Sequence, residues 1–151
     1  MRHRSGVVLR AGVLTGLIVA APVQAAPGDA GISLHVTGLR SARGQVLVCL
    51  TRNKAAFPDC SRDAHAVRRV VPAAQAAEID LGTVLPGTWA IALLHDENGN
   101  GRADMMLMLP REGFGFSRDP ALRLGPPAFA RAAFAVGAAP VRQTIRMRYM
   151  L

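Results

Sequence analysis

Short stretches with the periodicity of β-strands recur along this chain and are separated by glycine and proline. In the clearest of them, 141–149, apolar or amide side chains at odd positions alternate with arginine and threonine at even positions. Residues 32–37 alternate in the same way, and 46–50 are apolar throughout, as in a strand buried on both faces. After residue 25 we find no amphipathic helix pattern. The sequence predicts an all-β fold: a single antiparallel Greek-key β-sandwich of about seven strands.

The other strands are expected at 67–71, 76–81, 85–94 and 128–136. The stretch 85–94 begins with a Pro-Gly turn and contains Trp89, the single tryptophan, which we expect in the core. Residues 110–127 are rich in glycine and proline and have little apolar periodicity, so they predict a long ordered loop.

The N-terminal segment has the composition of a secretory signal peptide. A basic stretch, 1–10, precedes an apolar run at 11–23 and small residues at a cleavage site, so removal of residues 1–25 is expected. The apolar run is shorter than the ~20 residues that span a bilayer, and no transmembrane segment is expected after cleavage. The sequence therefore predicts a periplasmic or secreted protein with one domain at 26–151.

The mature chain is moderately basic. Removing the signal peptide takes away three arginines and leaves 15 basic against 10 acidic residues, a net charge of +5. Nucleic acid is not an expected partner outside the cytoplasm. The excess is moderate, so a merely solvated basic surface is the favoured interpretation, and an anionic glycan, a lipid surface or an envelope protein as partner is the alternative.

The two cysteines, Cys49 and Cys60, are an even count in a chain expected in an oxidising compartment. This arrangement predicts a disulfide that joins the strand at 45–51 to the loop that follows it. A buried free thiol at Cys49 is the alternative.

Several ordered motifs resemble one protein family. They are Leu-Pro-Gly-Thr-Trp at 85–89, His-Asp-Glu-Asn-Gly-Asn-Gly at 95–101 with Asp104, and Pro-Arg-Glu-Gly-Phe-Gly-Phe-Ser at 110–117. Together they resemble the secreted bacterial family catalogued as domain of unknown function 2141, over about residues 32–147. The resemblance implies an exported β-sandwich similar to transthyretin-like and carboxypeptidase regulatory domains. It implies no established activity.

The stretch 96–104 has the spacing of a calcium loop. Such loops present alternate oxygen-bearing side chains around a glycine turn. Asp96, Asn98 and Asn100 take the first, third and fifth places, Gly101 the sixth, the carbonyl of Arg102 the seventh and Asp104 the ninth. This order predicts a calcium site, a weak one because it has few carboxylates.

The twelfth place of the loop holds Leu107, where calcium loops have a bidentate glutamate. Glu112 is the candidate to fold back and complete the coordination shell, with water as the alternative. A plain hairpin turn without metal would also use the Asn-Gly pairs at 98–99 and 100–101.

Two further hypotheses concern copper and catalysis. Three methionines lie close to His95 and would supply soft ligands for copper: Met105, Met106 and Met108. A hydrolase would need a nucleophile such as Ser117 with a histidine base, but no catalytic motif accompanies these residues. We therefore expect a non-catalytic binding or accessory module with a calcium-loop-like turn. A periplasmic copper-binding protein and an unrecognised hydrolase are the alternatives.

Overall fold

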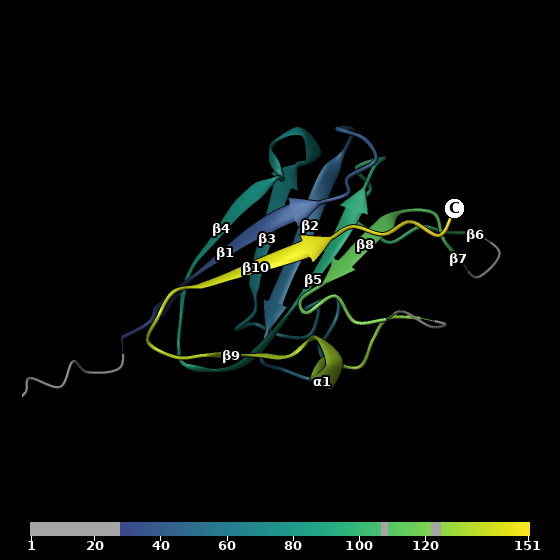
Figure 1. Ribbon diagram of the computed structural model, residues 1–151. Coiled ribbons are helices and arrows are strands. Elements are labelled where there is room, and N and C mark those ends of the chain that lie inside the picture. The colour runs from purple at the N-terminus through teal and green to yellow at the C-terminus, as the bar shows by residue number, and fades with distance from the viewer. Residues whose placement is uncertain (1–27, 107–108, 122–124) are drawn as a thin grey trace, which may run out of the picture.

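Two β-sheets packed face to face form the protein in the computed structural model, which describes residues 28–106, 109–121 and 125–151 (Figure 1). The predicted signal peptide at 1–25 lies outside these residues. One sheet has the strand order β10 (Val141–Arg146), β1 (Ala30–Thr37), β4 (Glu78–Val84). The other has the order β3 (Val67–Pro72), β2 (Gln45–Thr51), β5 (Gly87–Asp96), β8 (Gly113–Phe116), and β9 (Phe134–Val136) pairs with the start of β5.

The sandwich architecture confirms the predicted fold class. The chain crosses between the sheets after β1, β3, β4 and β9, as Greek-key connections do. Every strand pair is antiparallel except one among the described residues: β1 and β10 run parallel, with Ile32 opposite Val141 and Thr37 opposite Arg146. The parallel pair arises because β9 lies in the other sheet, and the chain returns from it to the end where β1 begins (Figure 1).

The core follows the alternation of side chains along β2 and β5. In β5, Trp89, Ile91 and Leu93 point between the sheets, where they join the main core. Ala90 and Ala92 point to the opposite face and help form a second, smaller core. Both faces of β5 are therefore covered, which explains its almost uninterrupted burial. Trp89 is 6% exposed, as predicted for a core residue.

The predicted loop at 110–127 contains a strand that the sequence pattern conceals. Strand β8 pairs with β5, but Gly113 and Gly115 occupy alternate positions and remove one half of the period-2 signal. These glycines are needed for packing: a Cβ at Gly115 would lie 2.7 Å from Cγ2 of Ile145, and one at Gly113 would overlap the ring of Tyr149.

Three other short features complete the fold. A hairpin of β6 (Met105–Met106) and β7 (Leu109–Pro110) precedes β8. The expected strand at 128–136 is instead α1 (Phe129–Ala132) followed by β9, and η1 (Ala73–Gln75) is a single 3-10 turn. In α1 the three-residue spacing of Phe129 and Ala132 places both in the second core. No helix in the described residues is long and apolar enough to cross a membrane.

The disulfide between Cys49 and Cys60 is present, as predicted. It attaches the loop after β2 to the outer face of the β2–β5–β8 sheet, where both sulfurs are buried in the second core. Phe57 from the same loop contacts Phe116 of β8 and Phe129 of α1, with ring centroids 5.9 and 5.8 Å apart. Phe116 therefore packs the 110–127 segment onto the second core.

Replacing both cysteines with serine is expected to lower the free energy of unfolding by about 2 to 3 kcal/mol, because the bridge restricts a loop of this length in the unfolded chain. Urea denaturation of the double variant, compared with the reduced and oxidised wild type, measures the effect. Equal midpoints for oxidised and reduced wild type would contradict it.

Candidate functional site

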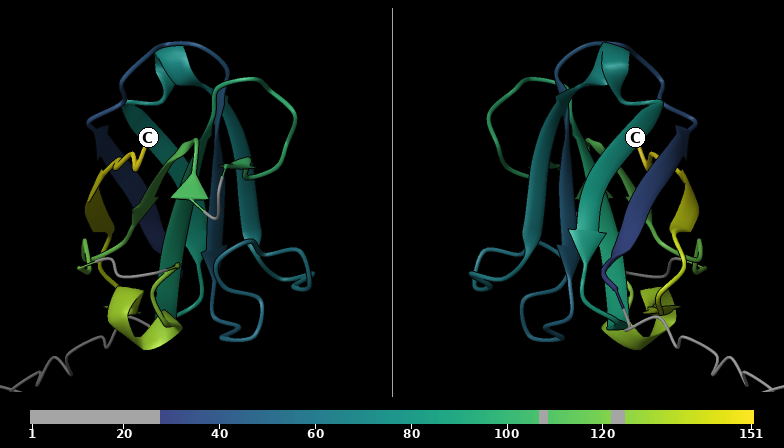
Figure 2. Two further views of the ribbon diagram at one scale, coloured as in Figure 1. Left: turned by 90° about the vertical axis from the view of Figure 1, so that its right-hand side faces the viewer. Right: turned by 90° about the vertical axis from the view of Figure 1, so that its left-hand side faces the viewer.

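The predicted cation loop begins at the last residue of β5, at the end of the sandwich opposite α1 (Figure 2). Strand β5 pairs with β8 rather than β6, so the Asn-Gly pairs lie in a wide connection between β5 and β8. Gly99 and Gly101 have φ values of 73° and 76°, the left-handed conformation that the Asn-Gly pattern favours.

Asp96 is the centre of this loop. Its carboxylate is fully buried, and Oδ1 accepts hydrogen bonds from the backbone nitrogens of Gly99 and Asn100 at 2.8 and 3.1 Å. Oδ2 accepts from Gly101 N at 2.7 Å and from the side-chain amide of Gln45 at 2.8 Å. Burial raises the pKa of Asp96, but these four hydrogen bonds outweigh it and the pKa is lowered overall. Asp96 is therefore ionised at neutral pH.

The other predicted side chains of the loop converge on Asp104. Asn98 Nδ2 donates to Asp104 Oδ2 at 2.5 Å, and Asn100 Nδ2 donates to Asp104 Oδ1 at 2.9 Å. The two amide oxygens accept from backbone nitrogens of the loop, those of Asn100 and Arg102. Binding a cation through these oxygens would require both amides to turn.

Glu112 returns to the loop as predicted. The β6–β7 hairpin reverses the chain, so that Arg111 N donates to the carbonyl of Asp104 and Asp104 N donates to Glu112 Oε2 at 3.1 Å. The Glu112 side chain is 4% exposed. Burial raises its pKa, and the carboxyls of Asp96 and Asp104 raise it further, by charge repulsion and, from Asp96, by a hydrogen bond.

The structure thus brings together five of the six predicted ligand residues: Asp96, Asn98, Asn100, Asp104 and Glu112. The sixth, Arg102, has an exposed side chain, and its backbone nitrogen rather than its carbonyl is bonded within the loop. Across the described residues, no group of three or more His, Cys, Asp or Glu side chains is arranged to hold a metal ion. The carboxylates therefore lie near one another without forming a closed coordination shell.

The residues flanking Asp96 form a network that the sequence did not predict. His95 is fully buried: its Nε2 donates to the carbonyl of Arg43 at 2.9 Å, and its Nδ1 accepts from the hydroxyl of Tyr149 at 2.7 Å. A carbonyl only accepts, which fixes this tautomer. Arg40 stacks on the Tyr149 ring at 4.4 Å and donates to Glu97 from Nε and Nη2. The C-terminal tail is thereby attached to the start of the loop.

This network makes stability depend on pH through Glu97. Hydrogen bonds from Arg40, opposed by burial and aided by Ser41, lower the pKa of Glu97 to about 2. A lowered pKa stabilises the fold above the usual value near 4.5, and this contribution is lost as pH falls towards 2. Replacing Glu97 with glutamine is therefore expected to lower the free energy of unfolding by about 2 kcal/mol at pH 7 and by almost nothing at pH 2. The loss at pH 7 is smaller than the full pKa shift would give, because Arg40 is partly exposed and solvent screens the pair. Urea titrations at several pH values test this; a difference that is independent of pH would contradict it.

The residues of the copper and hydrolase hypotheses are placed less favourably. Both ring nitrogens of His95 are occupied, and the side chains of the three methionines lie outside the described residues. Ser117 is fully buried and bonds to backbone atoms of Ile91 and Ala132. His35 instead contacts Glu78 on the surface at 2.7 Å. In the described part of the chain, no histidine bonds to Ser117.

The matches to known proteins are few. No curated protein and no solved structure matches this chain. The model of a family described as an uncharacterized protein conserved in bacteria, DUF2141, matches residues 34–144, which include β-strands of both sheets and the whole candidate loop. The resemblance seen in the sequence motifs is thereby confirmed, and the chain belongs to the DUF2141 family.

Proposed function

We propose that this protein is an exported, non-catalytic binding or accessory module whose 96–104 loop, completed by Glu112, binds calcium. The observation that carries the proposal is the return of Glu112 to the loop. Three carboxylates then lie close together, and among the residues that the structure describes no basic side chain is bonded to them. The disulfide and the predicted signal peptide support export, since disulfides persist in oxidising compartments.

The electrostatics of the loop favour a cation. The raised pKa of Glu112 means that its ionised form lowers the stability of the fold, because its charge is buried beside two others. A divalent cation would replace this repulsion with attraction, and carboxylate and amide oxygens are the ligands that calcium prefers. Asp96, Asp104 and Glu112 would supply charge, and Asn98 and Asn100 would supply neutral oxygens once turned. The role of the ion would be structural, as it would join the loop to the β7–β8 segment.

Calcium at about ten times its dissociation constant is expected to stabilise the wild type by about 1.4 kcal/mol. With few charged ligands, the dissociation constant should lie at about 10⁻⁴ to 10⁻³ M. Thermal unfolding in millimolar calcium and in chelator measures the effect. Identical midpoints would reject the proposal.

Glu112→Gln separates a calcium site from a metal-free turn. The variant removes the buried charge, so in chelator at pH 7 it should be at least as stable as the wild type. In calcium it should gain little stability, because a ligand is missing. Glu78→Gln is the matched control: Glu78 is an exposed glutamate of β4, and this variant should keep the full calcium response. An undiminished response in Glu112→Gln would exclude Glu112 as a ligand.

A further inference from the structure

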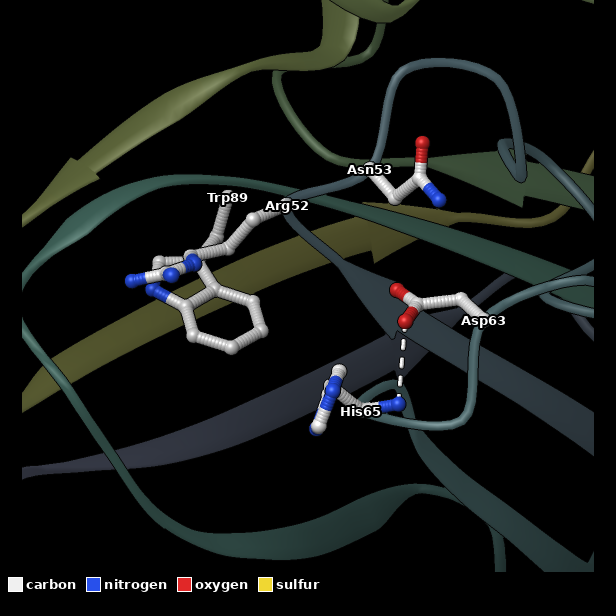
Figure 3. Close-up of a pocket in the computed structure, with 5 residues that line it drawn as sticks. All are labelled: Arg52, Asn53, Asp63, His65 and Trp89. Atoms are coloured by element: carbon white, nitrogen blue, oxygen red, sulfur yellow. Dashed lines mark hydrogen bonds between the residues drawn. The ribbon is translucent and has the colours of Figure 1, made fainter.

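A recess lies where β2 ends and β3 and β5 begin, at the end of the sandwich opposite the 96–104 loop (Figure 3). It consists of two hollows of about 320 and 400 Å³. Arg52, His65 and Trp89 line both of them. Hollows of this size accommodate small organic molecules. None of the sequence motifs pointed to this recess, because its lining comes from four separate segments.

One end of the recess is polar and cationic. The Arg52 guanidinium lies over the Trp89 ring, with Cζ 5.5 Å from the ring centroid, and meets no carboxylate among the described residues (Figure 3). Asp63 lines the same hollow, but its two oxygens accept from the hydroxyl of Thr51 at 2.5 Å and from His65 N at 2.9 Å. Asp63 is thus held by its own loop and makes no ion pair with Arg52.

The surrounding segment also carries an excess of positive charge. Residues 52–69 contain five basic and two acidic residues, a net charge of +3. Like Asp63, the second acid, Asp59, is bonded within the loop, to the nitrogen and hydroxyl of Ser61. Both carboxylates keep their negative charge, but the five basic residues outnumber them, so an anion placed on Arg52 would still meet a net positive field.

The other end of the recess is apolar. Val67, Val84 and Leu85 line it beside Trp89, and Leu85 is 60% exposed although it is a large hydrophobic side chain. The Trp89 indole nitrogen donates to the carbonyl of Leu85 at 3.0 Å, and this hydrogen bond fixes the Trp89 ring relative to Leu85. A ligand with an apolar body would cover Leu85 and release its hydration water.

We propose that this recess binds a small amphipathic carboxylate, with the carboxylate on the Arg52 guanidinium and the apolar body against Leu85 and Val67. The proposal rests on the binding role proposed above and gives it a ligand class. It does not depend on calcium, because the recess and the 96–104 loop lie at opposite ends of the sandwich.

The test uses 3-phenylpropanoate and its neutral amide, 3-phenylpropanamide, as probes. Trp89 is the single tryptophan, so its indole N–H signal in a nitrogen-15 NMR titration reports directly on the recess. We expect a saturable shift with the carboxylate, with a dissociation constant of about 1 mM, and at least tenfold weaker binding of the amide. The titration is run in calcium and in chelator. Equal binding in both supports the independence of the recess, even if the loop binds no calcium.

Arg52→Gln should weaken binding of the carboxylate about tenfold, and Arg52→Lys should weaken it less. Arg146→Gln is the matched control, since Arg146 is an exposed arginine of β10 outside the recess and should bind as the wild type does. Leu85→Ser tests the apolar end without removing a core residue, and should weaken both probes. No shift at 10 mM carboxylate, equal binding of the amide, or wild-type binding by Arg52→Gln in a folded variant would overturn the proposal.

Discussion

Replacing Asp96 with alanine is expected to lower the free energy of unfolding by about 4 kcal/mol or more, because each hydrogen bond to a charged group is worth about 1.5 to 3 kcal/mol. The side chain is fully buried and accepts four hydrogen bonds, three of them from backbone nitrogens of its own loop. Alanine leaves these donors without a partner. Urea denaturation in chelator isolates this structural effect from any contribution of calcium.

Two further variants show whether the effect belongs to the network. Asp96→Asn keeps one acceptor oxygen and should lose about half as much stability. Asp80→Ala is the matched control, because Asp80 is exposed and accepts one hydrogen bond, from Gly82 N at 2.8 Å. Its loss should cost less than about 1 kcal/mol. Equal effects at Asp80 and Asp96 would contradict the central role of Asp96.

Gly44→Ala is expected to be about as damaging, with a loss of about 4 kcal/mol. Gly44 has φ of 69° and lies against the backbone of the loop: a Cβ would overlap the carbonyl oxygen of Asp96 and sit 2.7 Å from the Cα of Glu97. The left-handed conformation costs a non-glycine residue about 1 to 2 kcal/mol, and forced overlap adds about 1 to 3 kcal/mol. Because the neighbouring atoms are backbone, no side chain can move away to relieve the contact.

Gly82→Ala separates these two contributions. Gly82 has φ of 78°, but a Cβ there would have no atom within 4 Å. The free energy of unfolding of this variant should fall only by the cost of the left-handed conformation, about 1 to 2 kcal/mol. The difference between the variants, measured by urea denaturation, gives the cost of the close approach at Gly44. A loss at Gly44 no greater than at Gly82 would show that the two segments are less tightly packed than described.

The alternation of side chains predicted much of the fold, because period 2 directly reflects which face of a strand is buried. It succeeded where both faces differ clearly, as in β1 and β10, and where a run is apolar throughout, as in β2. It failed at β8, where glycine replaces the side chains that would show the period. It also did not reveal that β10 pairs parallel to β1, since alternation carries no information about strand direction.

In the candidate site, too, some residues were predicted from the sequence and others were missed. Its spacing predicted the loop residues, because they are local in the sequence, and Glu112 was expected to return from a neighbouring segment. Gln45 and Tyr149 were missed: they lie far from the loop in the sequence, and their contacts depend on the pairing of β2 with β5 and on the path of the tail after β10. The recess at Arg52 and Trp89 was missed for the same reason.

The parallel pairing of β1 with β10 also determines when the protein can fold. Ile32 faces Val141 across this pair, so nearly the whole domain separates the two partners in the sequence. Contacts between such distant residues form late and slow the folding reaction, because the entropy of closing the intervening loop must be lost first. A chain still emerging from a ribosome or a membrane channel has β1 paired with β4 at most. The sheet therefore closes only after β10 has emerged, and one edge of β1 stays unpaired until then.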